Sequence, residues 1–342
     1  MKKKILVTGG TGYIGSHTAT ELLNEGFDVV IVDSLYNSEA EVVDRITSIT
    51  GTRPDLEVFD LCNQPDLNSF FKKHSGIEAI IHFAALKAVG ESVYKPLEYY
   101  RNNLVSLMNL LESMKKYRIP GLVFSSSCTV YGQPEKLPVA EDASIQPATS
   151  PYGNTKQIGE EIIRDTITSS ENIKAISLRY FNPIGAHPSG LIGELPRGVP
   201  ENLVPYITQT AIGLRDELKV FGNDYDTPDG SCIRDYLHVV DLAKAHVIAV
   251  KRLLENRNKS NYEVFNLGTG KGVSVLEAIE SFERVSGKKL KYRITGRRPG
   301  DIEKIWADPS LANSELGWKT ISTLDDAMKT AWEWEKKIRE NL

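Results

Sequence analysis

Residues 4–26, KILVTGGTGYIGSHTATELLNEG, decide the fold of this chain. The apolar residues at 4–8 predict a buried strand, and the amphipathic segment at 14–25 predicts a helix that stops at Gly26. The glycine-rich turn between them, TGGTGYIG at 8–15, can adopt positive φ and brings backbone amides to the positive end of the helix. Such a turn between a strand and a helix binds a pyrophosphate, although glycines alone would also fit an ordinary tight turn.

Asp33 decides between these two interpretations. It ends the next apolar run, DVVIVD at 28–33, about 20 residues beyond the glycines, where a carboxylate accepts hydrogen bonds from an adenosine ribose. A cofactor with a 2′-phosphate would be repelled by Asp33, and residues 34–38 contain no Arg or Lys to bind that phosphate. The sequence therefore predicts that the chain binds NAD.

Short apolar runs alternate with amphipathic stretches along the first half of the chain. This alternation is typical of parallel strands joined by helical crossovers, so we predict an α/β fold with a doubly wound parallel (Rossmann) sheet. A long helix is expected at 97–117. The strands are expected at 4–8, 28–33, 56–60, 78–83, 121–126 and 174–180.

The regular alternation weakens in the second half of the chain. Residues 182–200, NPIGAHPSGLIGELPRGVP, contain four Gly and four Pro, too many for a helix or a central strand, and predict a long loop. The shorter segments that follow predict a smaller mixed α/β lobe. We therefore assign 1–180 to an NAD-binding Rossmann domain, with segments around 234–266 returning to it, and 181–342 mainly to a substrate-binding lobe.

Composition excludes several classes of protein. With 342 residues, of which 41% are hydrophobic and 25% charged, the chain can bury a sizeable core, unlike a disordered protein. Its net charge of −4 argues against a nucleic-acid-binding surface, and its apolar runs are too short to span a membrane. The three cysteines form no CxxC pair and the six histidines no ligand spacing, so we expect no metal and a location in the reducing cytoplasm.

Tyr152 and Lys156, in SPYGNTK at 150–156, are the candidate catalytic pair. Four residues apart, they lie on one face of a helix and within reach of each other. A neighbouring ammonium and a cationic nicotinamide would favour the phenolate, so we expect the pKa of Tyr152 to fall towards neutrality and its oxygen to accept a hydroxyl proton. Ser127, in FSSSCTVYG at 124–132, is the candidate partner of a substrate hydroxyl. Taken alone, such a pair is common on surface helices, and such a serine is typical of turns and caps.

These features occur together in the order found in the extended short-chain dehydrogenase/reductase family, which the chain resembles throughout. Further stretches resemble one family within that group, the UDP-glucose 4-epimerases, over nearly the whole chain. Several such stretches in the right order are far more specific than any single glycine motif. They are HFAALKAVGES at 82–92, PLEYYRNN at 96–103, RYFNPIGAHPSG at 179–190, FGNDYDTPDG at 221–230 and RDYLHVVDLA at 234–243.

The resemblance implies which residues surround each ligand. Lys87 would reach a phosphate or ribose oxygen, and Lys156 would grip the nicotinamide ribose. Arg234 and Arg298 would bind the phosphates of a UDP-sugar through their guanidinium forks, although nearby carboxylates would also suit plain ion pairs. The implied NAD residues are Gly9, Gly12, Tyr13, Ile14, Gly15, Asp33, Ser34, Leu35, Tyr36, Asn37, Ser38, Asp60, Leu61, Phe83, Ala84, Ala85, Lys87, Asn102, Ser127, Tyr152, Lys156 and Phe181. The implied substrate residues are Ser127, Tyr152, Asn182, Asn202, Leu203, Lys219, Val220, Phe221, Arg234, Arg298, Asp301 and Ile305.

The resemblance also implies a reaction, that of an isomerase in galactose metabolism. Tyr152 would remove the proton of the sugar 4-hydroxyl while the hydrogen on the same carbon passes to NAD as a hydride. The keto sugar would turn over and take the hydride back on its other face, so UDP-glucose and UDP-galactose would interconvert without net oxidation. The resemblance further implies a homodimer joined through the helices at 97–117 and 152–170.

Three alternatives stay open at this point. A nucleotide-sugar 4,6-dehydratase starts with the same oxidation, but that family carries Asp-Glu where this chain has Cys128 and Thr129, which cannot supply an acid and a base at neutral pH. A non-catalytic NAD-binding protein would not need the serine, tyrosine and lysine. The third is an epimerase for UDP-GlcNAc and UDP-GalNAc, alone or alongside the glucose pair. In members confined to unacetylated sugars the position of Ile305 is often a tyrosine, and isoleucine is intermediate in size.

Overall fold

The computed structural model describes residues 2–170, 172–298 and 301–340. Within these residues the main sheet has seven parallel strands in the order β11-β6-β5-β4-β1-β2-β3. The strand order reverses at β1, and open sheets bind their ligands beside such a reversal, at the carboxyl ends of the strands. The strands are β1 (Lys4–Thr8), β2 (Asp28–Asp33), β3 (Asp55–Val58), β4 (Ile77–His82), β5 (Gly121–Ser125), β6 (Lys174–Tyr180) and β11 (Tyr262–Leu267).

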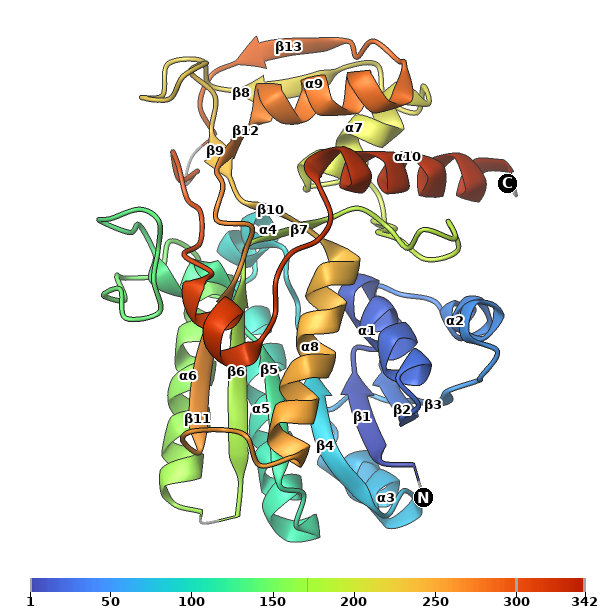
Figure 1. Ribbon diagram of the computed structural model, residues 1–342. Coiled ribbons are helices and arrows are strands. Elements are labelled where there is room, and N and C mark those ends of the chain that lie inside the picture. Colours follow the sequence, from blue (N-terminus) through green and yellow to red (C-terminus); the bar gives the residue numbers. More distant parts are fainter. Residues whose placement is uncertain (1, 171, 299–300, 341–342) are drawn as a thin grey trace.

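Helices cover both faces of this sheet (Figure 1). Because successive side chains of a strand point to opposite faces, each strand feeds two cores. One face packs on α1 (Tyr13–Asn24), α2 (Val42–Thr50) and α8 (Val239–Leu254), and the other on α3 (Gln64–Lys73), α5 (Pro96–Tyr117) and α6 (Pro151–Thr168).

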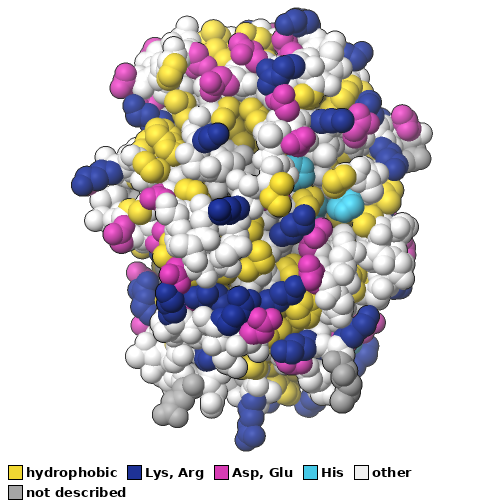
Figure 2. Space-filling model, viewed as in Figure 1, with side chains coloured by type: hydrophobic (Ala, Val, Ile, Leu, Met, Phe, Trp, Pro, Cys, Tyr) yellow, Lys and Arg dark blue, Asp and Glu magenta, His cyan; other side chains and the backbone are white. Residues whose placement is uncertain are grey.

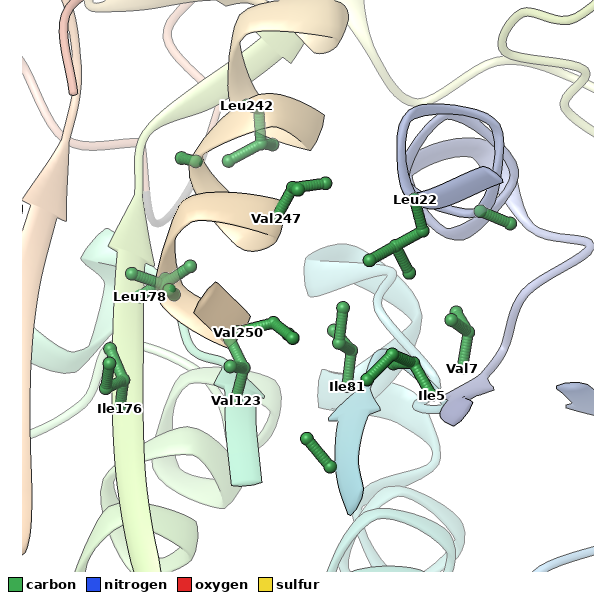
Figure 3. Close-up of a cluster of buried hydrophobic side chains, with 14 of the residues drawn as sticks. Ile5, Val7, Leu22, Ile81, Val123, Ile176, Leu178, Leu242, Val247 and Val250 are labelled. Atoms are coloured by element: carbon green, nitrogen blue, oxygen red, sulfur yellow. The ribbon is translucent and has the colours of Figure 1, made fainter. Parts of the chain in front are cut away.

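The core between the sheet and α1 and α8 fixes the edge that carries the site. Figure 3 shows Ile5 and Ile81 of the sheet meeting Leu22 of α1 and Val250 of α8. All four side chains are fully buried, and burial of each contributes about 1.5–3 kcal/mol. This packing holds β1 and the start of α1 in a fixed relation, which the turn between them requires.

The C-terminal lobe lies beyond the carboxyl ends of the strands, in the upper part of Figure 1. Its core contains Val220, Phe282, Met328 and Trp332. Its helices and strands are α7 (Leu203–Ala211), β8 (Leu218–Phe221), β9 (Ile233–Arg234), β10 (Tyr236–His238), β12 (Val273–Ser274), α9 (Val275–Ser286), β13 (Tyr292–Thr295) and α10 (Leu324–Glu340). Shorter elements elsewhere are α4 (Val89–Tyr94), η1 (Cys128–Tyr131), β7 (Asn182–Ile184) and η2 (Ala312–Leu316).

The expected Rossmann sheet is confirmed. The strands predicted at 4–8, 28–33 and 174–180 match β1, β2 and β6 residue for residue. The observed strands β3, β4 and β5 end one or two residues before the predicted ends. The loop predicted at 182–200 was wrong at its start, because the first three of these residues form β7. This strand pairs only with β10, outside the main sheet, so Pro183 is tolerated there.

The surface shows no single dominant charge on the face seen in Figure 2, where Lys and Arg side chains lie among Asp and Glu side chains over both lobes. Among the described residues, no helix is both long enough and apolar enough to cross a membrane. Within the same residues, no group of His, Cys, Asp and Glu side chains could hold a metal ion.

Candidate functional site

The predicted NAD residues lie in the loops and helices at the carboxyl edge of the sheet. This edge faces the C-terminal lobe (Figure 1). Most of these residues lie at or just after the ends of strands: 9–15 after β1, 33–38 at the end of β2, Asp60 and Leu61 after β3, and 83–87 after β4. Ser127 follows β5, and Phe181 follows β6. The remaining residues lie on helices, Asn102 on α5 and the pair Tyr152 and Lys156 on α6.

The glycine-rich turn between β1 and α1 lies so close to neighbouring backbone that it requires glycine at two positions. Gly9 has φ +69°, and a Cβ there would stand 2.8 Å from the amide nitrogen of Ala84, while a Cβ at Gly15 would meet the carbonyl oxygen of Gly9. α1 begins at Tyr13 with no side-chain cap from Gly12 and no acidic residue in its first turn. The positive end of the helix dipole therefore faces the turn uncompensated, which fits a pyrophosphate.

Asp33 is buried beside this turn and held by three donors. Its Oδ2 accepts a hydrogen bond from the amide of Thr11 at 3.1 Å. Its Oδ1 accepts from the amide of Leu35 at 2.9 Å and from the hydroxyl of Ser38 at 3.1 Å. The carboxylate is thus fixed at the end of β2, the place where this fold binds the ribose of a dinucleotide.

Arg197 reaches the same loop from a distant part of the sequence. Its Nη1 donates to the carbonyl of Tyr36 and its Nη2 to the carbonyl of Ser38, each at 2.8 Å. The sequence analysis considered only the residues that follow Asp33 directly, so it missed this arginine. Because the guanidinium is bonded to carbonyls and the Asp33 carboxylate is intact, NAD still fits better than a cofactor with a 2′-phosphate.

Asn103 holds the loop after β4 in place. Its Oδ1 accepts from the amide of Leu86 at 2.8 Å, and its Nδ2 donates to the carbonyl of Leu86 at 3.0 Å and to Thr155 Oγ1 of α6 at 3.1 Å. Asn103 thus joins a predicted cofactor loop to the helix of the catalytic pair. The sequence analysis chose the neighbouring Asn102, whose role towards NAD stays a prediction. The sequence shows that Asn102 and Asn103 are adjacent, but not which of the two side chains faces the loop.

Ser127 and Tyr152 lie together at the carboxyl end of β5. Tyr152 is in the first turn of α6, which Ser150 caps by accepting from the amide of Gly153 at 3.1 Å. The Ser127 hydroxyl accepts from the amide of Thr129 at 3.2 Å, and it lies close enough to Tyr152 to lower the pKa of the phenol. Ser127 is 7% and Tyr152 8% exposed, so the pair is largely shielded from water. This is an arrangement that can hold one substrate hydroxyl and exchange its proton.

Lys156 lies one turn along α6 from Tyr152, as the spacing predicts. Its Nζ donates to the carbonyl of Ser125 at 2.7 Å and lies 4.9 Å from the ring centroid of Phe124 and 5.8 Å from that of Tyr152. Burial lowers the pKa of Lys156 to about 8, and the carboxylate of Glu160 opposes part of this shift. Lys156 therefore still carries a charge at neutral pH, but the charged form is only weakly favoured over the neutral form.

The expected fall in the pKa of Tyr152 requires the positive charge of bound NAD, and without the cofactor the pKa lies above its usual value. Burial raises this pKa well above its usual value, the nearby Tyr180 raises it further, and the nearby Ser127 lowers it only in part. The Lys156 ammonium donates to the carbonyl of Ser125 rather than to the phenol, and burial is the largest of the effects on the pKa of Tyr152. In the protein alone, Tyr152 therefore keeps its proton.

A buried ion pair that the sequence analysis did not single out lies beside the catalytic residues. The guanidinium of Arg179 on β6 donates to the carboxylate of Glu160 on α6 at 2.9 Å and 2.5 Å, and the two side chains are 4% and 2% exposed. Glu160 also accepts from the hydroxyl of Ser126 at 2.6 Å. Since loss of one partner would strand a buried charge, this pair fixes α6 against β6 and the serine loop.

The structure brings four of the predicted substrate residues together in the C-terminal lobe. Asp301 accepts from Arg298 at 2.7 Å, and its Oδ1 lies 3.8 Å from Nη2 of Arg234. The Arg298 guanidinium also lies 5.4 Å from the ring centroid of Phe221. Both arginines therefore meet on one carboxylate, and a diphosphate would compete with that carboxylate for them.

The remaining substrate residues are spread over the lobe. The amide of Asn182 donates to the carbonyl of Asp235 at 2.9 Å, and the side chain of Asn202 donates to Glu194 at 2.6 Å. Leu203 begins α7, and Lys219 lies on β8. The side chain of Val220 lies in the lobe core, so only its backbone is available to a ligand.

Ile305 packs in a small buried cluster with Val130, Phe181 and Ala307, and Cys128 lies at the edge of this cluster. Only 2% of Ile305 is exposed. Burial raises the pKa of the Cys128 thiol to about 12. Cys128 stands at the position that bears an acid in the dehydratases. Its thiol therefore cannot act as an acid or a base at neutral pH.

Comparison with known proteins agrees with this arrangement. The UDP-glucose 4-epimerase of Bacillus subtilis is 51% identical over 331 residues, which are 97% of this chain and 96% of that protein. The chain belongs to the UDP-glucose 4-epimerase family. A family model described as GDP-mannose 4,6 dehydratase also matches residues 6–331.

Two crystal structures of the UDP-glucose 4-epimerase family superpose on almost the whole chain. The enzyme of Stenotrophomonas maltophila, with bound NAD and formylated UDP-arabinopyranose, has a TM-score of 0.96 and 48% identity, and the match covers 99% of this chain and 100% of that chain. The enzyme of Bifidobacterium longum, in complex with NAD+ and UDP, has a TM-score of 0.94 and 46% identity with the same coverage. These epimerases carry NAD on a fold that this chain shares.

Proposed function

We propose that this protein interconverts UDP-glucose and UDP-galactose with NAD that it keeps bound, as an enzyme of galactose metabolism in the cytoplasm. The observation that carries the proposal is that Ser127 and Tyr152 are both buried at the carboxyl edge of the sheet, with the Lys156 ammonium 5.8 Å from the ring centroid of Tyr152, at the edge that also carries the glycine-rich turn. Residues 1–180, together with α8 and β11, form the NAD-binding part, and most of the remaining chain binds the UDP-sugar.

The residues at the carboxyl edge of the sheet fit NAD. The start of α1 would hold the pyrophosphate, Asp33 the adenosine ribose, and Lys87 a phosphate or ribose oxygen. When bound, NAD would supply the acceptor and the donor of the hydride at C4 of the sugar, and the positive charge of its oxidised ring would favour the phenolate of Tyr152. The uncapped N-terminus of α1 and the three donors on Asp33 support this assignment.

Three residues of the chain contribute to the transfer of the proton of the sugar 4-hydroxyl group. Tyr152 exchanges the proton of the 4-hydroxyl group, and Ser127, which lies close enough to Tyr152 to lower its pKa, holds the same hydroxyl group on it. Burial alone would keep the phenol protonated, so the phenolate needs positive charge close by. Lys156 supplies part of that charge, because its pKa of about 8 leaves it protonated at neutral pH.

The site does not fit a 4,6-dehydratase, although the matching family model bears that description. Dehydration needs an acid and a base in addition to the tyrosine. Cys128 stands at the acid position, and burial raises its pKa to about 12. Thr129 offers only a hydroxyl group.

The proposal is tested by incubating the purified protein with UDP-galactose and no added NAD. UDP-glucose is followed by a coupled assay, and NAD is measured in the supernatant after denaturation. Turnover with NAD in the supernatant is the expected result. Bound NAD without turnover would move the assignment to another nucleotide-sugar or to a non-catalytic role, and the absence of both after NAD is added would contradict the proposal.

Ile305 determines whether N-acetylated sugars are also used. The cluster around Ile305 is closed, so a tyrosine there would push into the space beside Cys128 and Phe181. We expect Ile305→Tyr to lower kcat/KM for UDP-GalNAc at least tenfold and that for UDP-galactose by less than about threefold, with Ile305→Leu as the volume-conserving control. Equal UDP-GalNAc rates in the unmodified protein and Ile305→Tyr would remove Ile305 from substrate selection.

We propose a homodimer formed through α5 and α6. Leu97 and Met108 of α5 are 76% and 41% exposed, and Leu104 and Val105 lie partly exposed on the same side of the helix. Such an apolar stripe indicates a contact surface. Light scattering should give twice the chain mass for the unmodified protein and the chain mass for Leu97→Glu. A dimer in both would contradict this interface.

A further inference from the structure

The loop between β7 and α7 contacts both halves of the molecule. Figure 1 shows it passing between α10 and the helices α1 and α2. Its Glu194 is anchored on the lobe, because the carbonyl of Glu194 accepts from Nε1 of Trp334 at 2.9 Å. A Cβ on Gly193 would meet the Trp334 ring at 2.5 Å, so the backbone lies directly against that ring. The segment from Glu194 to Arg197 then crosses to the NAD-binding half.

Arg197 holds the loop that follows Asp33. Its two hydrogen bonds reach the carbonyls of Tyr36 and Ser38 at 2.8 Å, and a charged donor makes such bonds stronger than neutral ones. Within this loop Leu35 has φ +57°, a left-handed conformation that is unfavourable for leucine. Ser38 in turn donates to Asp33. The arginine therefore stabilises the conformation that keeps the Asp33 carboxylate in place.

Glu194 joins the two ligand sites. Its Oε1 accepts from Nζ of Lys87 at 3.2 Å and from Nδ2 of Asn202 at 2.6 Å, and its side chain is only 11% exposed. Lys87 is a predicted NAD residue and Asn202 a predicted UDP-sugar residue. A ligand that engages Asn202 therefore changes the partners of Glu194, and through it the position of Lys87.

We propose that residues 194–197 are a strap that retains NAD and couples its retention to occupancy of the UDP-sugar site, with Arg197 and Glu194 as positioning residues. This inference rests on the proposed function, since it takes NAD and a UDP-sugar as the ligands. By linkage, UDP bound to the lobe slows the release of NAD, and bound NAD tightens the binding of UDP.

The role of Arg197 is tested with the purified holoprotein and the variants Arg197→Met, Arg197→Lys and Arg53→Met. Arg53 is the matched control, an exposed arginine of the NAD-binding half that pairs with Asp44. NAD release is followed after gel filtration by measuring the nucleotide in the filtrate over time. We expect roughly tenfold faster release from Arg197→Met, a smaller increase from Arg197→Lys, and no change from Arg53→Met.

A purely structural role of Arg197 is separated by the kinetics. With saturating NAD added, Arg197→Met should recover the unmodified kcat and KM for UDP-galactose within about twofold. Release at the unmodified rate would overturn the strap. A loss of kcat that added NAD does not restore would also overturn it, since the arginine would then act on the catalytic residues or on the fold as a whole.

The role of Glu194 is tested by adding UDP during the release measurement. UDP should slow NAD release from the unmodified protein severalfold and have no effect on Glu194→Gln. An equal effect of UDP on both, or no effect on the unmodified protein, would overturn the coupling. An unmodified protein that holds no NAD would contradict the proposed function itself. Intact turnover, with the same rate of NAD release from the variants as from the unmodified protein, would contradict the strap alone.

Discussion

Replacing Tyr152 with phenylalanine is expected to lower kcat/KM for UDP-galactose by roughly 10³-fold while NAD stays bound. The phenol is the group placed to exchange the proton of the sugar hydroxyl, and phenylalanine keeps the ring that packs in this buried position. Phenylalanine has no polar atom to leave unpaired, so the fold should be unaffected. Steady-state kinetics, NAD content and thermal unfolding of the variant check these expectations.

Tyr117 provides the control for this substitution. It is a partly buried tyrosine of α5 whose hydroxyl donates to the carbonyl of Asn68 at 3.2 Å, away from the carboxyl edge of the sheet. Tyr117→Phe should stay within about twofold of the unmodified activity. Near-normal turnover by a folded Tyr152→Phe would show that another group exchanges the proton.

Replacing Lys156 with methionine is expected to lower kcat at least about 100-fold without lowering the free energy of unfolding. The pKa of Lys156 is lowered by burial from 10.5 to about 8, so below pH 8 the folded chain carries a charge that it disfavours. A folded pKa below the unfolded one means that this cost, roughly 3 kcal/mol, is present at neutral pH and is lost progressively as pH rises from about 8 to 10.5.

Methionine removes that cost but leaves the carbonyl of Ser125 without its donor, which costs about 1–3 kcal/mol. The two effects nearly cancel, so chemical denaturation at pH 7 should give an unfolding free energy equal to or above that of the unmodified protein. A clear loss of stability would mean that Lys156 mainly supports the fold. Unchanged kcat would remove it from the reaction.

Local sequence was sufficient to predict six of the seven strands of the main sheet, whereas β11 was foreseen only as part of a segment that returns to the domain. The run at 28–33 is β2 residue for residue, because a strand buried on both faces is continuously apolar and ends where its carboxylate begins the ligand loop. Tyr152 and Lys156 share a helix face because their spacing fits one turn. The turn at 8–15 needs glycine at positions where a Cβ would meet backbone atoms.

Contacts between distant segments could not be predicted in this way. Arg197 meets residues 36 and 38 although about 160 positions separate them, and Glu194 meets Lys87 across 107 positions. Neither pair has a local periodicity that would reveal it. The burial of Tyr152, which raises its pKa in the protein without NAD, was not foreseen either, since sequence shows a neighbouring lysine but not how deeply the phenol is buried.

The most direct test uses UDP-galactose that carries deuterium on C4, with a large excess of unlabelled NAD in solution. The same hydride leaves C4 and returns to it inside one bound complex, so the product should be UDP-glucose with the deuterium retained on C4, as measured by mass spectrometry and NMR. Loss of the label to solvent or to the free NAD pool would contradict transient oxidation at C4 on a retained cofactor.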